Sequence, residues 1–177
     1  MISIPTLETE RLVLRPWRDD DLDAYAALMA DPEVMRFLGG PQARPDAWRS
    51  IAAMLGHWVL RGFGAWAVER KSDGALLGRV GIQRPEGWPA TEVVWTLGRP
   101  YWGQGYATEG AKASLDYGFK ALPLSKLVSF IDAENVASQN VAKRLGYSKG
   151  GSATLFALGQ SFAVDVWEIT SDRWPSA

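Results

Sequence analysis

The segment WGQGYATEG, residues 102–110, combines two features that favour binding of a phosphate group. Gly103 and Gly105 flank a single residue, and a glycine lets a ligand approach the backbone amides without a side chain in the way. A helix is predicted to begin near Ala107, and the first turn of a helix has N–H groups without intrahelical partners. These N–H groups and the positive end of the helix dipole form an anion site. The alternative is a tight strand-to-helix turn that binds no ligand.

Two other phosphate-binding motifs can be compared with this loop. GRPYWGQG has Gly98 and Gly103 at the Walker spacing, but the next two residues, Gln and Gly, replace the lysine and the hydroxyl residue that the motif needs. A dinucleotide-binding fingerprint requires glycine where the chain has Thr108, although Asp132 follows at a tolerable distance as the acidic partner. The Walker interpretation therefore fails, and a dinucleotide-binding oxidoreductase remains as an alternative.

A second polar segment, ENVASQNVAKRLGY, has the boundary residues of a helix. Asn135 suits the N-cap position, Gly146 suits the position after the helix, and the cations Lys143 and Arg144 suit the last turn. Ser138 falls in the first turn, where a hydroxyl can bond to the local backbone. On these residues alone, a structural role is sufficient to explain the segment.

The elements that must position these segments alternate between strands and helices. Seven strands are predicted by alternating hydrophobicity and by β-branched and aromatic residues, at residues 10–17, 63–69, 76–83, 91–97, 127–131, 152–158 and 162–170. Four helices are predicted by apolar residues at helical spacing, at about residues 20–30, 45–60, 107–122 and 136–145. This order predicts a mixed α/β sheet in one layer with helices packed against it.

Two local features refine these elements. The pair Asp73-Gly74 predicts a hairpin turn between two strands, and Pro32 predicts the end of the first helix. The apolar stripe of the second helix is predicted to consist of Trp48, Ile51, Ala52, Leu55 and Val59.

Composition limits the class of protein. The chain has 177 residues, 47% of them hydrophobic, which predicts a single domain over residues 1–177. Cysteine is absent, so disulfides and thiol nucleophiles are excluded. A net charge of −1 predicts no direct binding to nucleic acid or to an anionic membrane. The N-terminal residues lack the pattern of a signal peptide, so a cytoplasmic location is expected.

Three segments in this order resemble one family. LETERLVLRPW is similar to the opening strand of the GCN5-related N-acetyltransferases (GNAT), LGRPYWGQGYATEG to their acetyl-CoA loop, and NVASQNVAKRLGY to their closing helix. The resemblance covers nearly the whole chain and is greatest to the RimJ/RimL-like branch, which is typified by ribosomal-protein N-terminal acetyltransferases. The family pattern falls on Trp102, Gly105 and Ala107; tryptophan at the first of these departs from the general family but agrees with this branch.

The resemblance implies a single-domain α/β (α+β) fold. A mixed, mostly antiparallel sheet of about seven strands, splayed in the middle, is expected together with about four helices. Acetyl-CoA is implied as co-substrate, with no metal. Its pyrophosphate is expected at the loop amides, and its pantetheine arm in a cleft between residues 91–97 and residues 126–132. The implied binding residues are Trp95, Thr96, Leu97, Trp102, Gly103, Gln104, Gly105, Tyr106, Ala107, Thr108, Asn135 and Ser138.

The resemblance also implies direct acetyl transfer to an amine, without a covalent enzyme intermediate. Glu92 is the candidate base, and its structural alternatives are a solvated carboxylate or an ion pair. Ser138 is the candidate proton donor to the leaving thiolate, because the position at which many relatives have a tyrosine is Ala142 here. Glu109, in the first turn of its helix, is expected to act as a dipole partner or a packing anchor.

The implied acceptor is a primary amine, either a protein N-terminal α-amine or a small molecule. Trp48, Trp58 and Trp66 are candidates for lining the acceptor cleft, although their spacing does not establish it. A non-catalytic acyl-CoA-binding sensor is the main alternative function, and the dinucleotide-binding oxidoreductase is the weaker one. The oligomeric state is open, with a homodimer as one option.

Overall fold

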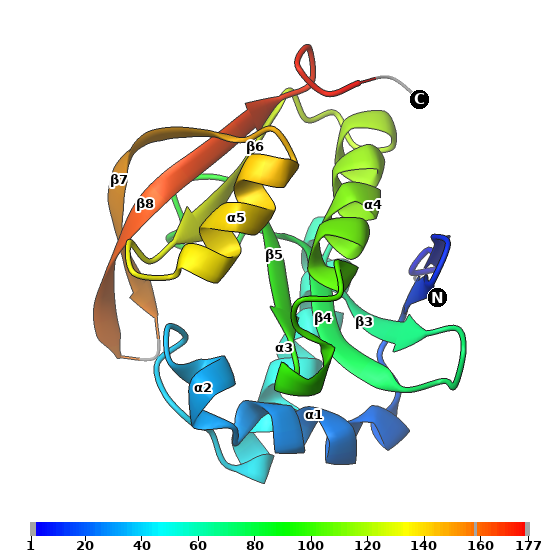
Figure 1. The fold of residues 1–177 in the computed structure, drawn as a ribbon. Helices are drawn as coiled ribbons and strands as arrows, with labels where there is room; N and C mark the ends of the chain where they lie inside the picture. The colour runs from blue at the N-terminus through cyan, green and yellow to red at the C-terminus, as the bar shows by residue number, and fades with distance from the viewer. Residues whose placement is uncertain (1–2, 158, 176–177) are drawn as a thin grey trace.

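Eight strands form one sheet in the order β1-β2-β3-β4-β5-β6-β8-β7 in the part of the chain that the computed structural model describes, residues 3–157 and 159–175 (Figure 1). Neighbouring strands run antiparallel except β5 and β6, which are parallel. The strands are β1 (Leu7–Glu8), β2 (Leu12–Arg15), β3 (Ala65–Arg70), β4 (Leu76–Gln83), β5 (Glu92–Leu97), β6 (Lys126–Ile131), β7 (Ser148–Ala157) and β8 (Gln160–Thr170).

Five α-helices accompany the sheet in the described residues. They are α1 (Leu22–Met29), α2 (Pro32–Met35), α3 (Arg44–Arg61), α4 (Tyr106–Lys120) and α5 (Val136–Arg144). Alternate residues of β3 point to opposite faces, as strand geometry requires. Trp66 and Val68 pack in the same core cluster as α4, whereas Ala65 and Ala67 pack with α1 and α3. Helices therefore cover both faces of this half of the sheet (Figure 1).

The predicted fold class is confirmed, with two short elements added. The mixed, mostly antiparallel sheet has eight strands rather than seven, because the described chain includes the two-residue β1. Pro32 follows the end of α1 as predicted, but it also begins the four-residue helix α2, since proline is tolerated in a first helical turn. The predicted strand at 152–158 begins earlier, at Ser148, and its last residue, Leu158, lies outside the described residues.

The prediction for the buried face of α3 is wrong: a neighbouring face of the helix packs against the core. Its buried residues are Ala47, Ile51, Met54 and Trp58, and of the five residues predicted to form the stripe Ile51 alone is among them. Trp48 and Val59 are more than half exposed. Apolar residues recur at helical spacing on two adjacent faces of this helix, so contact with the sheet selects between them. Trp58 packs edge-on against Trp66 of β3, with ring centroids 4.9 Å apart.

A buried ion pair fixes the start of α1 against the sheet. Arg15 of β2 contacts Asp21 at 2.7 Å and Glu69 of β3 at 2.6 Å. The side chains of Arg15 and Asp21 are 7% and 6% exposed. Burial by itself raises the pKa of Asp21, but hydrogen bonds from Arg15 and from the backbone N–H of Arg18 outweigh it and hold this pKa below its usual value.

The sheet divides between β5 and β6, which are paired only where Glu92 lies opposite Val128. Beyond this pair the two strands diverge towards the C-terminal end of β5, where the glycine loop begins (Figure 1). We call this opening the fork; its closed end is at Glu92 and Val128. Within the described residues no helix is long and apolar enough to cross a bilayer.

Candidate active site

The glycine loop places its amides at the N-terminus of α4. Gly103 and Gly105 have φ angles of +73° and +84°, in the left-handed region that favours glycine. Gly105 directly precedes Tyr106, the first residue of α4. Among the described residues, no protein oxygen accepts a hydrogen bond from the N–H groups of residues 103–108. A Cβ added at Gly103 would meet no atom within 4 Å, so the loop has donors and open space for an anion.

Arg11 holds this loop in place. Its guanidinium donates to the carbonyl of Gln104 at 2.9 Å and to Glu109 at 2.7 Å, and it lies 4.4 Å from the centre of the Tyr106 ring. Glu109 also accepts hydrogen bonds from the hydroxyl of Thr9 and the backbone N–H of Arg11. Glu109 is therefore a packing anchor, one of the two roles predicted for it. The hydrophobic pattern assigned Arg11 only a strand position, with no role at the loop.

The end of β5 supplies only part of the backbone that was predicted to bind pantetheine. Thr96 lies opposite Arg79 of β4, and the Leu97 carbonyl accepts a hydrogen bond from the indole of Trp102 at 2.7 Å. At the closed end of the fork, the Val93 carbonyl accepts from the hydroxyl of Ser129 at 2.8 Å. Backbone groups alternate in direction along a strand, so those of Trp95 face the fork as well. Among the three, the structure thus leaves the backbone of Trp95 and the N–H of Leu97 open to a ligand there.

Ser138 lies across the fork from β5, on α5. Its hydroxyl accepts a hydrogen bond from the indole of Trp95 at 3.3 Å, and its backbone N–H donates to the side chain of Asn135 at 3.1 Å. The second bond makes Asn135 the N-cap of α5, as its position in the sequence predicted. The structure therefore brings three predicted site residues to the fork, with Trp95 on the wall formed by β5 and Asn135 and Ser138 on the opposite wall.

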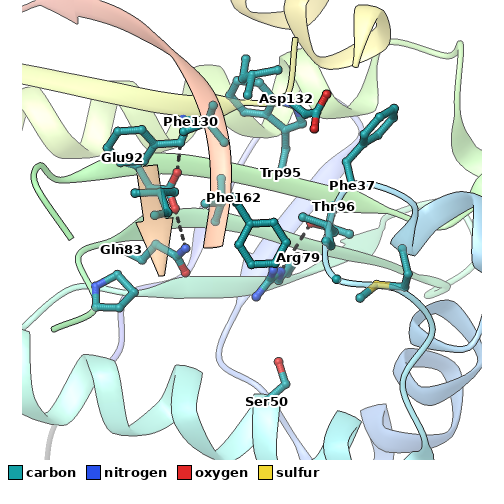
Figure 2. A pocket seen from close by; sticks show the side chains of 18 of the residues that line it. Phe37, Ser50, Arg79, Gln83, Glu92, Trp95, Thr96, Phe130, Asp132 and Phe162 are labelled. Atoms are coloured by element: carbon teal, nitrogen blue, oxygen red, sulfur yellow. Dashed lines mark hydrogen bonds between the residues drawn. The ribbon is translucent and has the colours of Figure 1, made fainter. Parts of the chain in front are cut away.

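A cavity of about 760 Å³ adjoins the fork. It lies between β4, β5 and β6 on one side and α3 and the segment after α2 on the other. The aromatic side chains in its lining are Phe37, Trp88, Trp95, Phe130 and Phe162 (Figure 2). The tryptophans considered from the sequence do not line it: Trp58 and Trp66 are 2% and 0% exposed in the core, and Trp48 is on the outer face of α3.

Glu92 reaches this cavity from the closed end of the fork. It is 2% exposed, and it accepts hydrogen bonds from the Gln83 amide at 2.6 Å and from the backbone N–H of Phe130 at 3.4 Å. Burial raises the pKa of Glu92 to about 8, and these two donors and the charge of Arg79 offset only part of that rise. In the described chain no cation lies within ion-pair distance of Glu92, so it is neither a solvated carboxylate nor an ion-pair partner.

Two polar residues of β4 join the site without having been predicted. Gln83 contacts Glu92, and Arg79 lines the cavity with its side chain half-buried. They are four residues apart, so their side chains lie on the same face of β4. The other side chains of this strand include the buried apolar residues Leu77, Val80 and Ile82. Charged and amide side chains repeated on one face of a buried strand were the signal available in the sequence. No group of three or more metal-ligating side chains is found in residues 3–157 and 159–175.

Comparisons with known proteins give consistent matches to this chain. A model of the acetyltransferase (GNAT) domain matches residues 11–148. The uncharacterized protein YkkB of Bacillus subtilis is 35% identical over 153 residues, which cover 81% of this chain and 86% of YkkB. The uncharacterized N-acetyltransferase YoaA of the same organism is 26% identical over 174 residues, covering 96% and 98% of the two chains.

A solved structure has the same arrangement of elements. The crystal structure of the acetyltransferase from Agrobacterium tumefaciens str. C58 superposes with a TM-score of 0.83 at 34% sequence identity, over 96% of each chain.

Proposed function

Because this chain belongs to the acetyltransferase (GNAT) family and is an acyltransferase enzyme, we propose that it transfers the acetyl group of acetyl-CoA directly to a primary amine. The observation that carries the proposal is the fork. Free N–H groups of residues 103–108 lie at its open side, and the buried Glu92 lies at its closed end beside a cavity.

In this proposal the loop amides bind the pyrophosphate of acetyl-CoA. The pantetheine arm then follows β5 inward past the backbone of Trp95, with Ser138 and Asn135 on the opposite wall. The strand from Leu97 to Glu92 rises about 17 Å over this distance. The thioester is thereby held near the closed end of the fork, where an amine in the cavity can reach it.

The reaction forms one bond and breaks another without an enzyme-bound intermediate, and the absence of cysteine excludes an acyl-thiol intermediate. The nitrogen of the neutral amine attacks the thioester carbonyl carbon, the C–N bond forms, and the C–S bond breaks. Glu92 accepts the proton that the nitrogen loses. A carboxylate with a pKa of about 8 is a stronger base than a solvated one, and the cavity holds the amine in reach of it.

The thiolate of coenzyme A must also take up a proton. Ala142 cannot supply one, and the Ser138 hydroxyl, bonded to the Trp95 indole, is a candidate on the wall of the fork. We keep Ser138 in this role, directly or through water. A thiolate with a pKa of about 8.5 can also take its proton from solvent, so the effect on rate is expected to be small.

The acceptor is proposed to be an α-amine, either of a protein N-terminus or of a small molecule. The resemblance of the loop to the RimJ/RimL-like branch supports this choice. An α-amine has a pKa near ~7.8, so about a tenth of it is neutral at pH 7, whereas less than about a thousandth of a lysine amine is. A single buried carboxylate is therefore a sufficient general base for the attack of an α-amine.

Binding and turnover test the proposal separately. Thermal shift should show stabilisation by acetyl-CoA and none by NAD, since a ligand at about 100 times its Kd stabilises a protein by about 2.7 kcal/mol. Release of free thiol from acetyl-CoA, measured with a panel of amines, should depend on the acceptor. Stabilisation by NAD alone, or thiol release that no amine accelerates, would contradict the proposal.

A further inference from the structure

Arg79 is a cation in the wall of the cavity without a carboxylate partner among the described residues. Its side chain is half-buried, and its one hydrogen bond there is to the hydroxyl of Thr96, at the long distance of 3.5 Å. A neutral hydroxyl at this distance compensates little of the hydration that a guanidinium loses on burial. The five N–H donors of an arginine are therefore largely available to a ligand.

No other charged side chain of the cavity forms an ion pair with Arg79 in the described residues. Asp46 is paired with Arg49 at 2.6 Å. Asp132 lies at the end of β6 and accepts a hydrogen bond from the backbone N–H of Glu134 at 2.8 Å. Glu92 is largely protonated at neutral pH because of its burial. The cavity thus presents one uncompensated positive group on the face of β4.

Arg79 and Glu92 lie at two separate places along the same surface. Arg79 is opposite Thr96 and Gln83 is opposite Glu92, so the two pairs are four residues apart on β4 and β5. Figure 2 shows the Glu92–Gln83 pair and the Arg79–Thr96 pair at different positions along the sheet. Four residues of a strand span about 13 Å between Cα atoms, and the long Arg79 side chain shortens this gap for a ligand.

We propose that the acceptor is an aminocarboxylate, a primary amine joined through a spacer to a carboxylate, and that Arg79 binds this carboxylate. The inference rests on the proposed acetyl transfer and names the substrate class for it. The amine lies at Glu92, the carboxylate accepts hydrogen bonds from the Arg79 guanidinium, and the spacer crosses the apolar wall between them, where Val94 and Phe162 line the cavity. Arginine suits this role because its planar donors match a carboxylate in two places.

The spacing favours an acceptor longer than a free α-amino acid, in which amine and carboxylate share one carbon. An extended peptide spans about 3.3–3.6 Å per residue, so a dipeptide or tripeptide, whose amine is an α-amine, bridges the gap.

Matched acceptors test the proposal. Initial rates of thiol release are compared for di- and tripeptides with a free carboxylate, each against its own amide, with spermidine as an acceptor without an anion. The wild-type enzyme should prefer each acid of suitable length over its amide by roughly 10- to 100-fold in kcat/KM, mainly through KM. In Arg79→Gln this preference should fall to near one, while KM for acetyl-CoA stays unchanged. Arg79→Lys should restore part of it.

The control is Arg49→Gln, which removes the arginine of the same cavity that already has a carboxylate partner. This variant should keep the preference for the acid. Equal kcat/KM for acid and amide in the wild type, or a preference that survives in Arg79→Gln, would overturn the proposal.

Calorimetry separates failure of this inference from failure of the acetyl transfer. Acid and amide are titrated into the protein in the presence of coenzyme A. One outcome is that no acceptor is turned over, but the acid binds tighter than the amide and Arg79→Gln abolishes the difference. This outcome supports the carboxylate site and contradicts the proposed acetyl transfer. If acid and amide bind alike, the carboxylate site is wrong whatever the turnover shows.

Discussion

Replacement of Glu92 by Gln tests whether a buried carboxyl serves as the base. The substitution keeps the size of the side chain, and a glutamine oxygen can still accept the 2.6 Å hydrogen bond from Gln83. The substitution removes the 3.4 Å hydrogen bond from the backbone N–H of Phe130, which is weak at that length. The Glu92→Gln variant should therefore fold, and its defect should be in proton transfer.

The size of the defect follows from the pKa of about 8 for Glu92. The ionised fraction is then ~0.01 at pH 6, ~0.1 at pH 7 and ~0.9 at pH 9. If the base contributes about 100-fold, at the low end for general base catalysis, the ratio of wild-type to variant kcat/KM should be about 2, about 10 and about 90 at these three pH values. Ionisation of the amine cancels in the ratio, because it is common to both enzymes.

The assay is thiol release at subsaturating acceptor from pH 6 to pH 9, with both enzymes in the same buffers. A ratio near one throughout would show that Glu92 is structural. A large ratio that is constant with pH would show that Glu92 is ionised over the whole range, so that burial does not raise its pKa as reasoned. Gln83→Met serves as a second variant: it removes a hydrogen bond that stabilises the ionised form, so the rise in kcat/KM should move to higher pH.

The same titration should appear in stability. Folded Glu92 holds its proton up to about pH 8, whereas the unfolded carboxyl loses it near its usual pKa of 4.5. Between these values unfolding releases a proton, so stability falls as pH rises. The Tm of the wild type should decline relative to that of Glu92→Gln across this window. Parallel Tm curves would contradict the raised pKa independently of any catalytic role.

Two further predictions concern the loop and the buried ion pair. Gly105→Val should weaken acetyl-CoA binding at least about tenfold by calorimetry, because its φ of +84° disfavours a side chain by ~1–2 kcal/mol and an added Cβ would lie 3.3 Å from the Arg11 guanidinium that holds the loop. Gly74→Val, in a turn at φ +71° with open space around it, should leave the affinity unchanged. Asp21→Ala should lower the free energy of unfolding in urea by about 2–4 kcal/mol, because the buried Arg15 loses one of its two carboxylate partners and keeps only Glu69. Asp73→Ala, which removes an exposed ion pair, should cost much less than Asp21→Ala, and equal losses in the two variants would contradict the distinction between buried and exposed pairs.

Local chemistry made much of the fold predictable. Strands and helices were located from patterns that depend on neighbouring residues, and the starts of α4 and α5 were set by Gly105 and Asn135, whose own backbone or side chain ends the preceding segment. The glycine loop was recognisable for the same reason, because positive φ at Gly103 and Gly105 is a property of the residue type.

Contacts between distant segments decided what the patterns left open. Two faces of α3 have apolar residues at helical spacing, and only packing of Trp58 on Trp66 selects one of them. The Leu97 carbonyl looks free in a strand, but the indole of Trp102 folds back onto it. The role of Arg11 in holding the loop likewise depends on Gln104, more than ninety positions away.

The sequence by itself determined that a strand containing Glu92, a glycine loop before a helix and a capped helix with Ser138 follow one another, in an order that resembles the GNAT family. Only the tertiary structure decided that Glu92 is buried and that Arg79 lies in the same cavity without a carboxylate beside it. The physical reason is desolvation: the charge state of a carboxyl and the availability of a guanidinium depend on which side chains exclude water around them, and folding brings those side chains from β4, β6 and the far end of the chain.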